Sequence, residues 1–273
     1  MTATRTATEP SRTQHSERSV RSLVQQTLVQ TKRILTRWGR DLVTVLEALV
    51  LPVALMLVIY IVLGKLIYAM THDSALYSIV PLLALGGAVS GSAFVAIDLM
   101  REQSSGLLTR LWVMPVHRAS GPLSRILAEA IRIMVTTGVM LGAGVLLGFR
   151  FREGAFAALI WMGIPVIFGM AFAAVTTTVA LYVSKTLVVE AVELWQLLLI
   201  FFSTGLLPLN QYPHWIQPVV AHQPVSYAVA AMRGLSAGGP VLAPLVATVL
   251  WSAGIAAACV VPMAIGYRRA STH

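Results

Sequence analysis

The sequence predicts an all-α integral membrane protein with six transmembrane helices and several shorter helices near the membrane surfaces. Of its 273 residues, 57% are apolar and only 11% are charged, whereas soluble domains are about a quarter charged. The mean hydropathy is +0.77. The apolar residues also gather in stretches that can cross hydrocarbon, which takes about 20 residues. This composition excludes a soluble globular enzyme, and a single cysteine, Cys259, excludes an internal disulfide framework.

The first 40 residues are predicted to stay out of the bilayer. Residues 1–19 are rich in Thr, Ser and Arg and lack apolar periodicity, which is typical of a disordered tail, here a cytoplasmic one. Residues 20–40 follow helical spacing, with basic residues on one face. The other, mostly apolar face carries Val20, Leu23, Val24, Thr27, Leu28, Thr31, Ile34, Leu35 and Trp38. Such a helix is too polar to span and suits an anionic membrane surface. A helix packed on a protein partner is the alternative interpretation, and one helix can contact both the membrane surface and a partner.

Residues 41–273 are predicted to form one six-span transmembrane domain. The six uncharged or weakly charged stretches are 42–63, 74–97, 130–149, 155–184, 187–207 and 241–267. Runs of small residues, such as 86–91 and 138–142, favour close helix packing.

The ionisable residues within or beside these stretches are expected to reach the membrane surface. Arg132 is long enough to extend its guanidinium back to the headgroups. For Glu190 and Glu193, ion pairing near Lys185 is favoured over an intramembrane proton path. The same surface position, with ion pairing, is expected for Asp98 and Glu129.

Positive charge is distributed unevenly between the two sides of the membrane. With the N-terminus inside, the cytoplasmic segments carry sixteen of the twenty Lys and Arg residues. Because cytoplasmic loops are enriched in Lys and Arg, both termini are predicted to be cytoplasmic. The net charge of +9 then reflects topology and lipid attraction, with no nucleic acid as a partner.

The cytoplasmic segment 98–125 is predicted to contain a short helix. Leu107, Leu108, Leu111 and Trp112 recur at helical spacing, and Pro115 ends the pattern. An apolar edge on a cytoplasmic helix favours a protein groove as its binding place. An interfacial helix resting on headgroups fits the sequence almost equally well.

The extracellular segment 205–239 is apolar but is interrupted by four prolines. Its uninterrupted pieces are too short to cross the bilayer. Short apolar pieces at a membrane boundary are typical of re-entrant or interfacial helices packed against the bundle.

The sequence lacks the common catalytic and nucleotide-binding motifs. There is no G-x-x-x-x-G-K-[ST], H-E-x-x-H or G-x-S-x-G pattern. His214 and His222 have no carboxylate within their segment, so a loop role is favoured over metal binding. No enzymatic activity and no cofactor of its own are expected for this chain.

Two longer patterns resemble a known family. They are REQSSGLLTRLWVMP at residues 101–115, and an outer segment that begins GLLPLNQYPHWIQP at residue 205 and continues QPVSYAVAAMRG to residue 234. With the N-terminal amphipathic helix and six spans, they resemble the ABC-2 family of ATP-binding-cassette exporter permeases, in particular the daunorubicin-resistance (Drr) type. The resemblance covers all but the first 20 or so residues.

The resemblance implies two protein partners and three functional regions. A second, homologous permease would pair with the chain, and a separate ATPase subunit would bind ATP and Mg. The segment from Arg101 to His117 would be the coupling helix that enters the ATPase. Its site residues would be Arg101, Glu102, Gly106, Leu107, Arg110, Leu111, Trp112, Pro115 and His117. The interfacial helix would use Lys32, Arg33, Arg37 and Trp38. The re-entrant gate over the exit path would use Pro208, Tyr212, Trp215, Pro224, Tyr227 and Arg233.

The implied cargo is amphipathic or lipidic. Family members export anthracycline-type drugs or large surface lipids such as phthiocerol dimycocerosates across the plasma membrane of bacteria. A polysaccharide- or glycolipid-exporting permease is the first alternative, but this bundle has few polar or aromatic residues for a sugar path. A membrane-embedded enzyme would need a convergent nucleophile and base, and none is visible in the spans. A purely structural membrane subunit also stays open.

Overall fold

The computed structural model describes residues 20–71, 73–104, 120–183 and 185–272, and within these ranges the chain is helical and contains no strand. The prediction of an all-α protein is therefore confirmed. The elements are α1 (Val20–Arg40), α2 (Leu42–Val45), a π-helical turn (Leu46–Val50), α3 (Leu51–Thr71), α4 (Leu76–Ser104), α6 (Ser120–Leu146), α7 (Gly154–Ala180), α8 (Lys185–Phe201), a 3₁₀ turn (Leu209–Gln211), α9 (Gln217–His222), α10 (Pro224–Ala237) and α11 (Leu242–Thr272).

Five of the described helical segments are long and apolar enough to cross a membrane. They are Leu42–Thr71, Leu76–Arg101, Leu123–Leu146, Gly154–Ala180 and Leu242–Gly266. The remaining predicted span, 187–207, which is the fifth in chain order, corresponds to α8, which has only 17 residues. At 1.5 Å per residue it is about 26 Å long, somewhat less than the roughly 30 Å of the hydrocarbon core. Five spans thus have full length, and the sixth stays a prediction.

The first span passes a proline without breaking. Pro52 has no N–H to donate to the carbonyl of Ala48, and its ring crowds that turn. The chain widens into a π-turn over Leu46–Val50, and the Leu51 N–H bonds to the Leu46 carbonyl five residues back. Such wide turns absorb one misfit inside an α-helix. α2, the π-turn and α3 therefore form one continuous 30-residue span.

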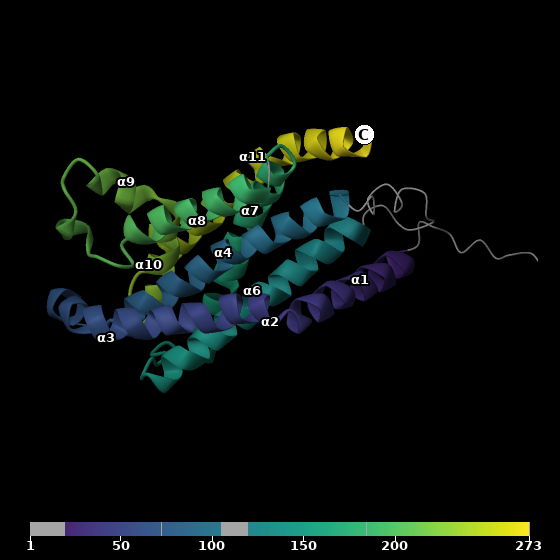
Figure 1. Cartoon of the computed structure of the whole chain (residues 1–273). Helices are drawn as coiled ribbons and strands as arrows, with labels where there is room; N and C mark the ends of the chain where they lie inside the picture. The colour runs from purple at the N-terminus through teal and green to yellow at the C-terminus, as the bar shows by residue number, and fades with distance from the viewer. Residues whose placement is uncertain (1–19, 72, 105–119, 184, 273) are drawn as a thin grey trace, which may run out of the picture.

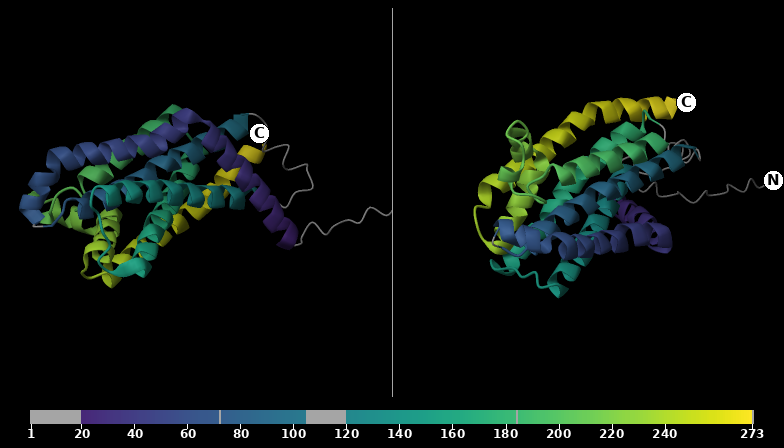
Figure 2. Two further views of the ribbon diagram at one scale, coloured as in Figure 1. Left: turned by 90° about the horizontal axis from the view of Figure 1, so that it is seen from below. Right: turned by 60° about the vertical axis from the view of Figure 1, so that its left-hand side comes forward.

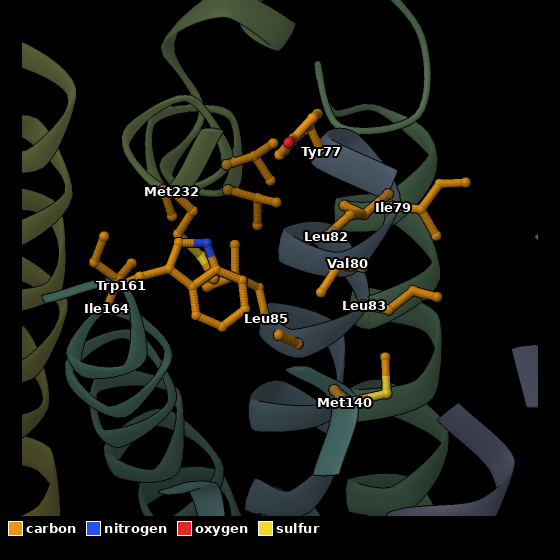
Figure 3. Packing of buried hydrophobic residues seen from close by; sticks show 14 of the residues in the cluster. Tyr77, Ile79, Val80, Leu82, Leu83, Leu85, Met140, Trp161, Ile164 and Met232 are labelled. Carbon is orange, nitrogen blue, oxygen red and sulfur yellow. The ribbon is translucent and has the colours of Figure 1, made fainter. Parts of the chain in front are cut away.

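Helix α4 lies at the centre of the bundle. In its most apolar window, 78% of the residues are buried, against 11% in the spans formed by α3 and α11. The core joins α4 to α7 and α10, and Figure 3 shows the Trp161 ring among Leu85, Ile164 and Met232 from these three helices. Gly169 of α7 permits this packing, because a Cβ there would lie 2.7 Å from Ile133 and 2.9 Å from Ala88. The spans formed by α3 and α11 therefore leave most of their apolar side chains exposed.

The connections between helices collect at two ends of the bundle (Figures 1 and 2). One end, called the outer end below, holds the α3–α4 turn, the α6–α7 turn and the segment with α9 and α10. The other, called the inner end, holds α1, the C-terminal end of α4, the start of α6 and the C-terminal end of α11. The first described helix, α1, and the C-terminal end of the last, α11, therefore lie at the same end of the bundle.

The surface positions expected for Arg132 and Glu129 are wrong. The Arg132 side chain is 5% exposed and that of Glu129 3% exposed. Arg132 donates from Nε to Glu129 Oε2 at 2.9 Å and from Nη2 to Oε1 at 2.5 Å. A Cβ on Gly91 of α4 would lie within 2.0 Å of the guanidinium. The charge can stay inside because a carboxylate one turn earlier compensates it and a glycine leaves space for it.

Candidate functional site at the two ends of the bundle

The outer segment forms a compact structure on top of the bundle. Of the 14 residues of α10, nine are buried, and the helix packs on α4, α7 and α11. Pro224 begins α10, where its missing N–H costs nothing, and Gly238 ends it with a φ of +95°, which few other residues adopt. Both α9 and α10 are too short to span, as the sequence predicts.

Arg233 connects α10 to two other segments. Its Nη2 donates to Ser78 Oγ of α4 at 2.9 Å and to the carbonyl oxygen of Thr204 at 3.0 Å. Burial lowers the pKa of the guanidinium, because desolvation penalises the charged form, and the charge of Asp73 opposes this shift. The acceptors of these two hydrogen bonds are neutral oxygens.

The loop before α9 and the start of α10 are both held to the end of α8 and the residues after it by side-chain hydrogen bonds. The Tyr212 hydroxyl lies 2.7 Å from the carbonyl oxygen of Phe201 and 3.0 Å from that of Ser203, and burial raises its pKa. Gln223 donates to the carbonyl of Phe202, and Ser226 Oγ accepts from the backbone N–H of Thr204 at 3.2 Å. These contacts give the segment a defined shape.

The remaining predicted gate residues do not gather at one point. Pro208 caps the 3₁₀ turn and is half-buried, and Tyr227 is half-buried with its ring 6.3 Å from that of His222. Trp215 is 79% exposed. Among the described residues, Arg233 and Tyr212 alone of this set make side-chain hydrogen bonds that connect separate segments.

At the inner end, α1 is held against α6 by polar groups. Thr31 is buried and lies with its Oγ1 3.2 Å from the carbonyl oxygen of Ser124. Gln30 donates to Ser120 Oγ at 3.3 Å and accepts from Ser124 Oγ at 3.3 Å. Val24 and Leu28, from the predicted apolar face, stay about half exposed. The helix thus contacts its own protein with one strip and leaves these two apolar side chains exposed.

The predicted residues of the interfacial helix occupy different environments. Lys32 and Arg33 are exposed, and Arg37 donates from Nη2 to Asp98 Oδ1 of α4 at 3.0 Å. Trp38 is half-buried, and its indole nitrogen is buried without a hydrogen-bond partner among the described residues. After it, Asp41 caps α2 through Thr44, and these hydrogen bonds lower the pKa of the Asp41 carboxyl.

Most of the predicted coupling residues lie outside the described residues. Arg101 is exposed near the C-terminal end of α4, and Glu102 belongs to the same helix. The others are Gly106, Leu107, Arg110, Leu111, Trp112, Pro115 and His117, and their coupling role stays a prediction.

Sequence reasoning missed several residues that build these ends. Ser78 and Thr204 give no local signal, because they meet Arg233 only through contacts across the fold. The spacing of Glu129 and Arg132 at i and i+3 could have predicted their pairing, since such residues are neighbours on a helix. Within the described ranges, no three His, Cys, Asp or Glu side chains gather as a metal site would require.

Comparison with known proteins places this architecture in a family. Residues 25–236 match the model of the ABC-2 type transporter. The chain is 65% identical over 264 residues to the probable doxorubicin resistance ABC transporter permease protein DrrC in two strains of Mycobacterium tuberculosis, covering 97% of this chain and 96% of each relative. It is 21% identical over 216 residues to the daunorubicin resistance ABC transporter permease protein DrrB1 of Streptomyces coeruleorubidus, covering 79% of this chain and 76% of that protein. This chain belongs to the ABC-2 type transporter membrane family.

Proposed function

We propose that this chain is the permease subunit of an ABC exporter that moves amphipathic drugs of the doxorubicin and daunorubicin class out of a bacterial cell. The observation that carries the proposal is the 65% identity to a permease named for doxorubicin resistance, which extends over 97% of the chain. The second relative is named for daunorubicin resistance. Lipidic cargo such as phthiocerol dimycocerosate is the second class that the sequence resemblance implies, and the names of the relatives favour the drugs.

The proposed topology has six spans and cytoplasmic termini, with α8 as the fifth span in chain order. The charge distribution supports the orientation, because sixteen of the twenty Lys and Arg residues then lie on the cytoplasmic side. The common end of α1 and α11 agrees with an even number of spans. In this orientation the inner end is cytoplasmic, and α9 and α10 form a re-entrant roof over the exit path. The plasma membrane is its proposed location.

Cysteine labelling tests this topology. With Cys259 replaced by Ser, single cysteines at Gly154 and Gln211 should react with an impermeant maleimide on intact cells. Cysteines at Ser105 and Ser271 should react only after the membrane is opened. Reaction at Ser105 on intact cells would overturn the orientation.

The proposed motor is a separate ATPase subunit, with ATP and Mg bound there, and a second permease completes the membrane domain. Two observations support these partners. The chain has no phosphate-binding loop in its sequence, and the apolar faces of α3 and α11 are open for contact within the membrane.

A pair of charge substitutions tests the coupling segment. In membranes that also contain the proposed partner ATPase, Leu111→Asp or Trp112→Asp would place an unpaired charge in the docking groove, which is costly when buried. We expect loss of ATPase pull-down and of drug-stimulated ATP hydrolysis, with normal insertion of the permease. Thr109→Asp adds the same charge on the polar side of the predicted helix and should leave both intact. If the two apolar-face variants also keep both, the segment is an interfacial helix and the motor contacts another surface.

A further inference from the structure

The turn between α6 and α7 lies at the outer end, beside the C-terminal end of α10. The backbone N–H of Arg152 in this turn donates to the carbonyl oxygen of Ser236 at 2.9 Å. Its side-chain Nη1 donates to the carbonyl oxygen of Ala237 at 3.5 Å. The last carbonyl groups of a helix have no partner within the helix, and a basic side chain is a favourable partner for them. Arg152 therefore caps α10 from another segment.

The same guanidinium also contacts the start of α4 and the turn before it. Its Cζ lies 5.2 Å from the centroid of the Tyr77 ring, which is a cation–π distance. Its Nη2 lies 3.9 Å from Asp73 Oδ1, in the turn between α3 and α4. Arg152 thus joins the α6–α7 turn to two other segments, which are the end of α10 and the start of α4.

The α6–α7 turn is a firm support for Arg152. Phe149 is fully buried, and its ring lies 5.2 Å from that of Tyr77 and 6.1 Å from that of Trp161. Tyr77 and Trp161 belong to the buried cluster drawn in Figure 3. The Tyr77 hydroxyl also donates to the carbonyl oxygen of Arg150 at 3.0 Å. Buried contacts therefore join this turn to α4 and α7.

The end of α10 is held less firmly at this point. The side chains of Arg152 and Asp73 are 57% and 55% exposed, so water screens their attraction. Gly238 and Gly239 follow α10 with φ angles of +95° and +134°, and glycines can absorb the backbone changes of a hinge. One turn before the end, Arg233 holds α10 through two shorter hydrogen bonds of 2.9 and 3.0 Å. The exposed contacts of Arg152 are therefore the weaker of the two attachments.

The parts of a fold that open are those that are held weakly. We propose that Arg152 is a latch residue, which holds the last turn of α10 against the α6–α7 turn and on release lets that turn move about Gly238 and Gly239. That this movement opens an exit path for a drug rests on the proposed function. Arg152 is a positioning residue in this account, because it acts on export through α10.

Thiol labelling of the purified full-length chain tests the latch. With Cys259 replaced by Ser, Ser236→Cys places one thiol in the last turn of α10, where the side chain is fully buried. The rate of its reaction with a maleimide measures how often that turn opens. We expect Arg152→Gln to speed the reaction about tenfold, because a cation–π contact and an exposed ion pair each shift an equilibrium by about two- to fivefold. Arg152→Lys keeps the charge and should give an intermediate rate.

A matched variant and a second thiol position make the result specific. Arg150 is an exposed arginine of the same turn, and its Nη1 donates to the carbonyl oxygens of Val145 and Phe149 in its own segment. Arg150→Gln should therefore leave the labelling rate of the α10 thiol unchanged. Ser92→Cys instead places the thiol in α4, where Ser92 is fully buried, and its rate should not respond to Arg152→Gln.

Three outcomes of the labelling would overturn the latch. The first is an unchanged rate of the α10 thiol in Arg152→Gln. The second is an equal rise in Arg150→Gln, which would show general loosening of the α6–α7 turn. The third is an equal rise for the thiol in α4, which would show that the whole chain is destabilised. All three are measured on the chain alone, without drug or ATPase.

A disulfide tests whether release of the latch is needed for transport. Arg152 and Ser236 are hydrogen-bonded backbone to backbone, so we expect cysteines at these two positions to form a disulfide. In cells that also contain the proposed partner ATPase and second permease, doxorubicin export should stop in the oxidised double variant and return on reduction. Export that continues in the oxidised form would overturn release as a step of transport. If the unmodified chain exports no doxorubicin, the proposed function fails, and the labelling still decides whether Arg152 is a latch.

Discussion

The outer end and the inner half of the bundle each hold an arginine away from water, but they stabilise it in different ways. Arg233 at the outer end donates to neutral oxygens of two segments, one of which is 155 residues away in sequence. Arg132, inside the span Leu123–Leu146, pairs with a carboxylate of its own helix, three residues earlier. The outer arginine therefore holds separate segments together, whereas the inner one belongs to a local, charge-compensated pair. Loss of a partner has a different physical consequence at each site.

The largest expected effect is at the buried pair of Glu129 and Arg132. Glu129→Ala leaves the Arg132 charge buried without its partner, which typically costs about 3–5 kcal/mol. Thermal unfolding of the purified protein, followed by loss of the monodisperse peak in size-exclusion chromatography, should show a strongly destabilised variant. The double variant Glu129→Ala with Arg132→Met removes both charges and should recover most of the stability. If the double variant is as unstable as Glu129→Ala, charge compensation is not the reason for the pair.

A smaller effect is expected at the outer end. Arg233→Ala removes two hydrogen bonds from a charged donor, each worth about 1.5–3 kcal/mol. Part of this loss of stability is recovered because the variant no longer has to bury a charged guanidinium. The same unfolding assay should show a clear loss, and drug export should fall with it. Arg233→Lys retains the charge and can keep one hydrogen bond, so its stability should lie between that of the unmodified chain and that of Arg233→Ala.

Trp215→Ala is the matched control in the outer segment. Because Trp215 is 79% exposed, its truncation should change stability by no more than about 0.5 kcal/mol. Export should nevertheless fall if the outer segment roofs the exit path. Normal export by this variant would favour a passive anchor at the membrane surface.

A similarly small effect on stability is expected from the exposed pair at the inner end. Arg37 and Asp98 are 53% and 39% exposed, so water and salt screen their attraction. Arg37→Ala should cost only about 0.2–1 kcal/mol, and the difference from the unmodified chain should shrink at high salt. A loss as large as that of Glu129→Ala would mean that this pair, and not the polar contacts of Thr31 with α6, holds α1 in place.

Helix bounds were largely predictable from local patterns. The helix predicted for residues 20–40 is present as α1, and five of the six predicted spans have full-length helices. The remaining stretch, 187–207, is long enough as a run of apolar residues, but its helix α8 ends at Phe201. After Phe201 the side chains of Tyr212 and Gln223 hold the chain in a loop. Hydropathy counts apolar residues without knowing where the backbone leaves the helix, so this stretch looked like the others.

The two ends were less predictable than the spans. For α1, helical periodicity placed Thr27, Thr31 and Leu28 on one face, but only the threonines are buried, against α6, while Leu28 is exposed. For Arg132, the hydropathy rule that sends charges to the surface failed because a glycine on α4 and a glutamate on α6 provide a compensated site inside. Both outcomes depend on which neighbour lies opposite, and a single sequence does not state that.

By itself the sequence determined that the protein is helical and belongs in a membrane, because these properties depend on the sum of residue hydropathies along the chain. Only the tertiary structure decided that Arg233 meets Ser78 and Thr204, that Arg132 fits against Gly91, and that five arginines line one cavity with Trp38. These arrangements join residues from helices far apart in sequence. Their free energies depend on distances and burial, which exist only once the helices have packed.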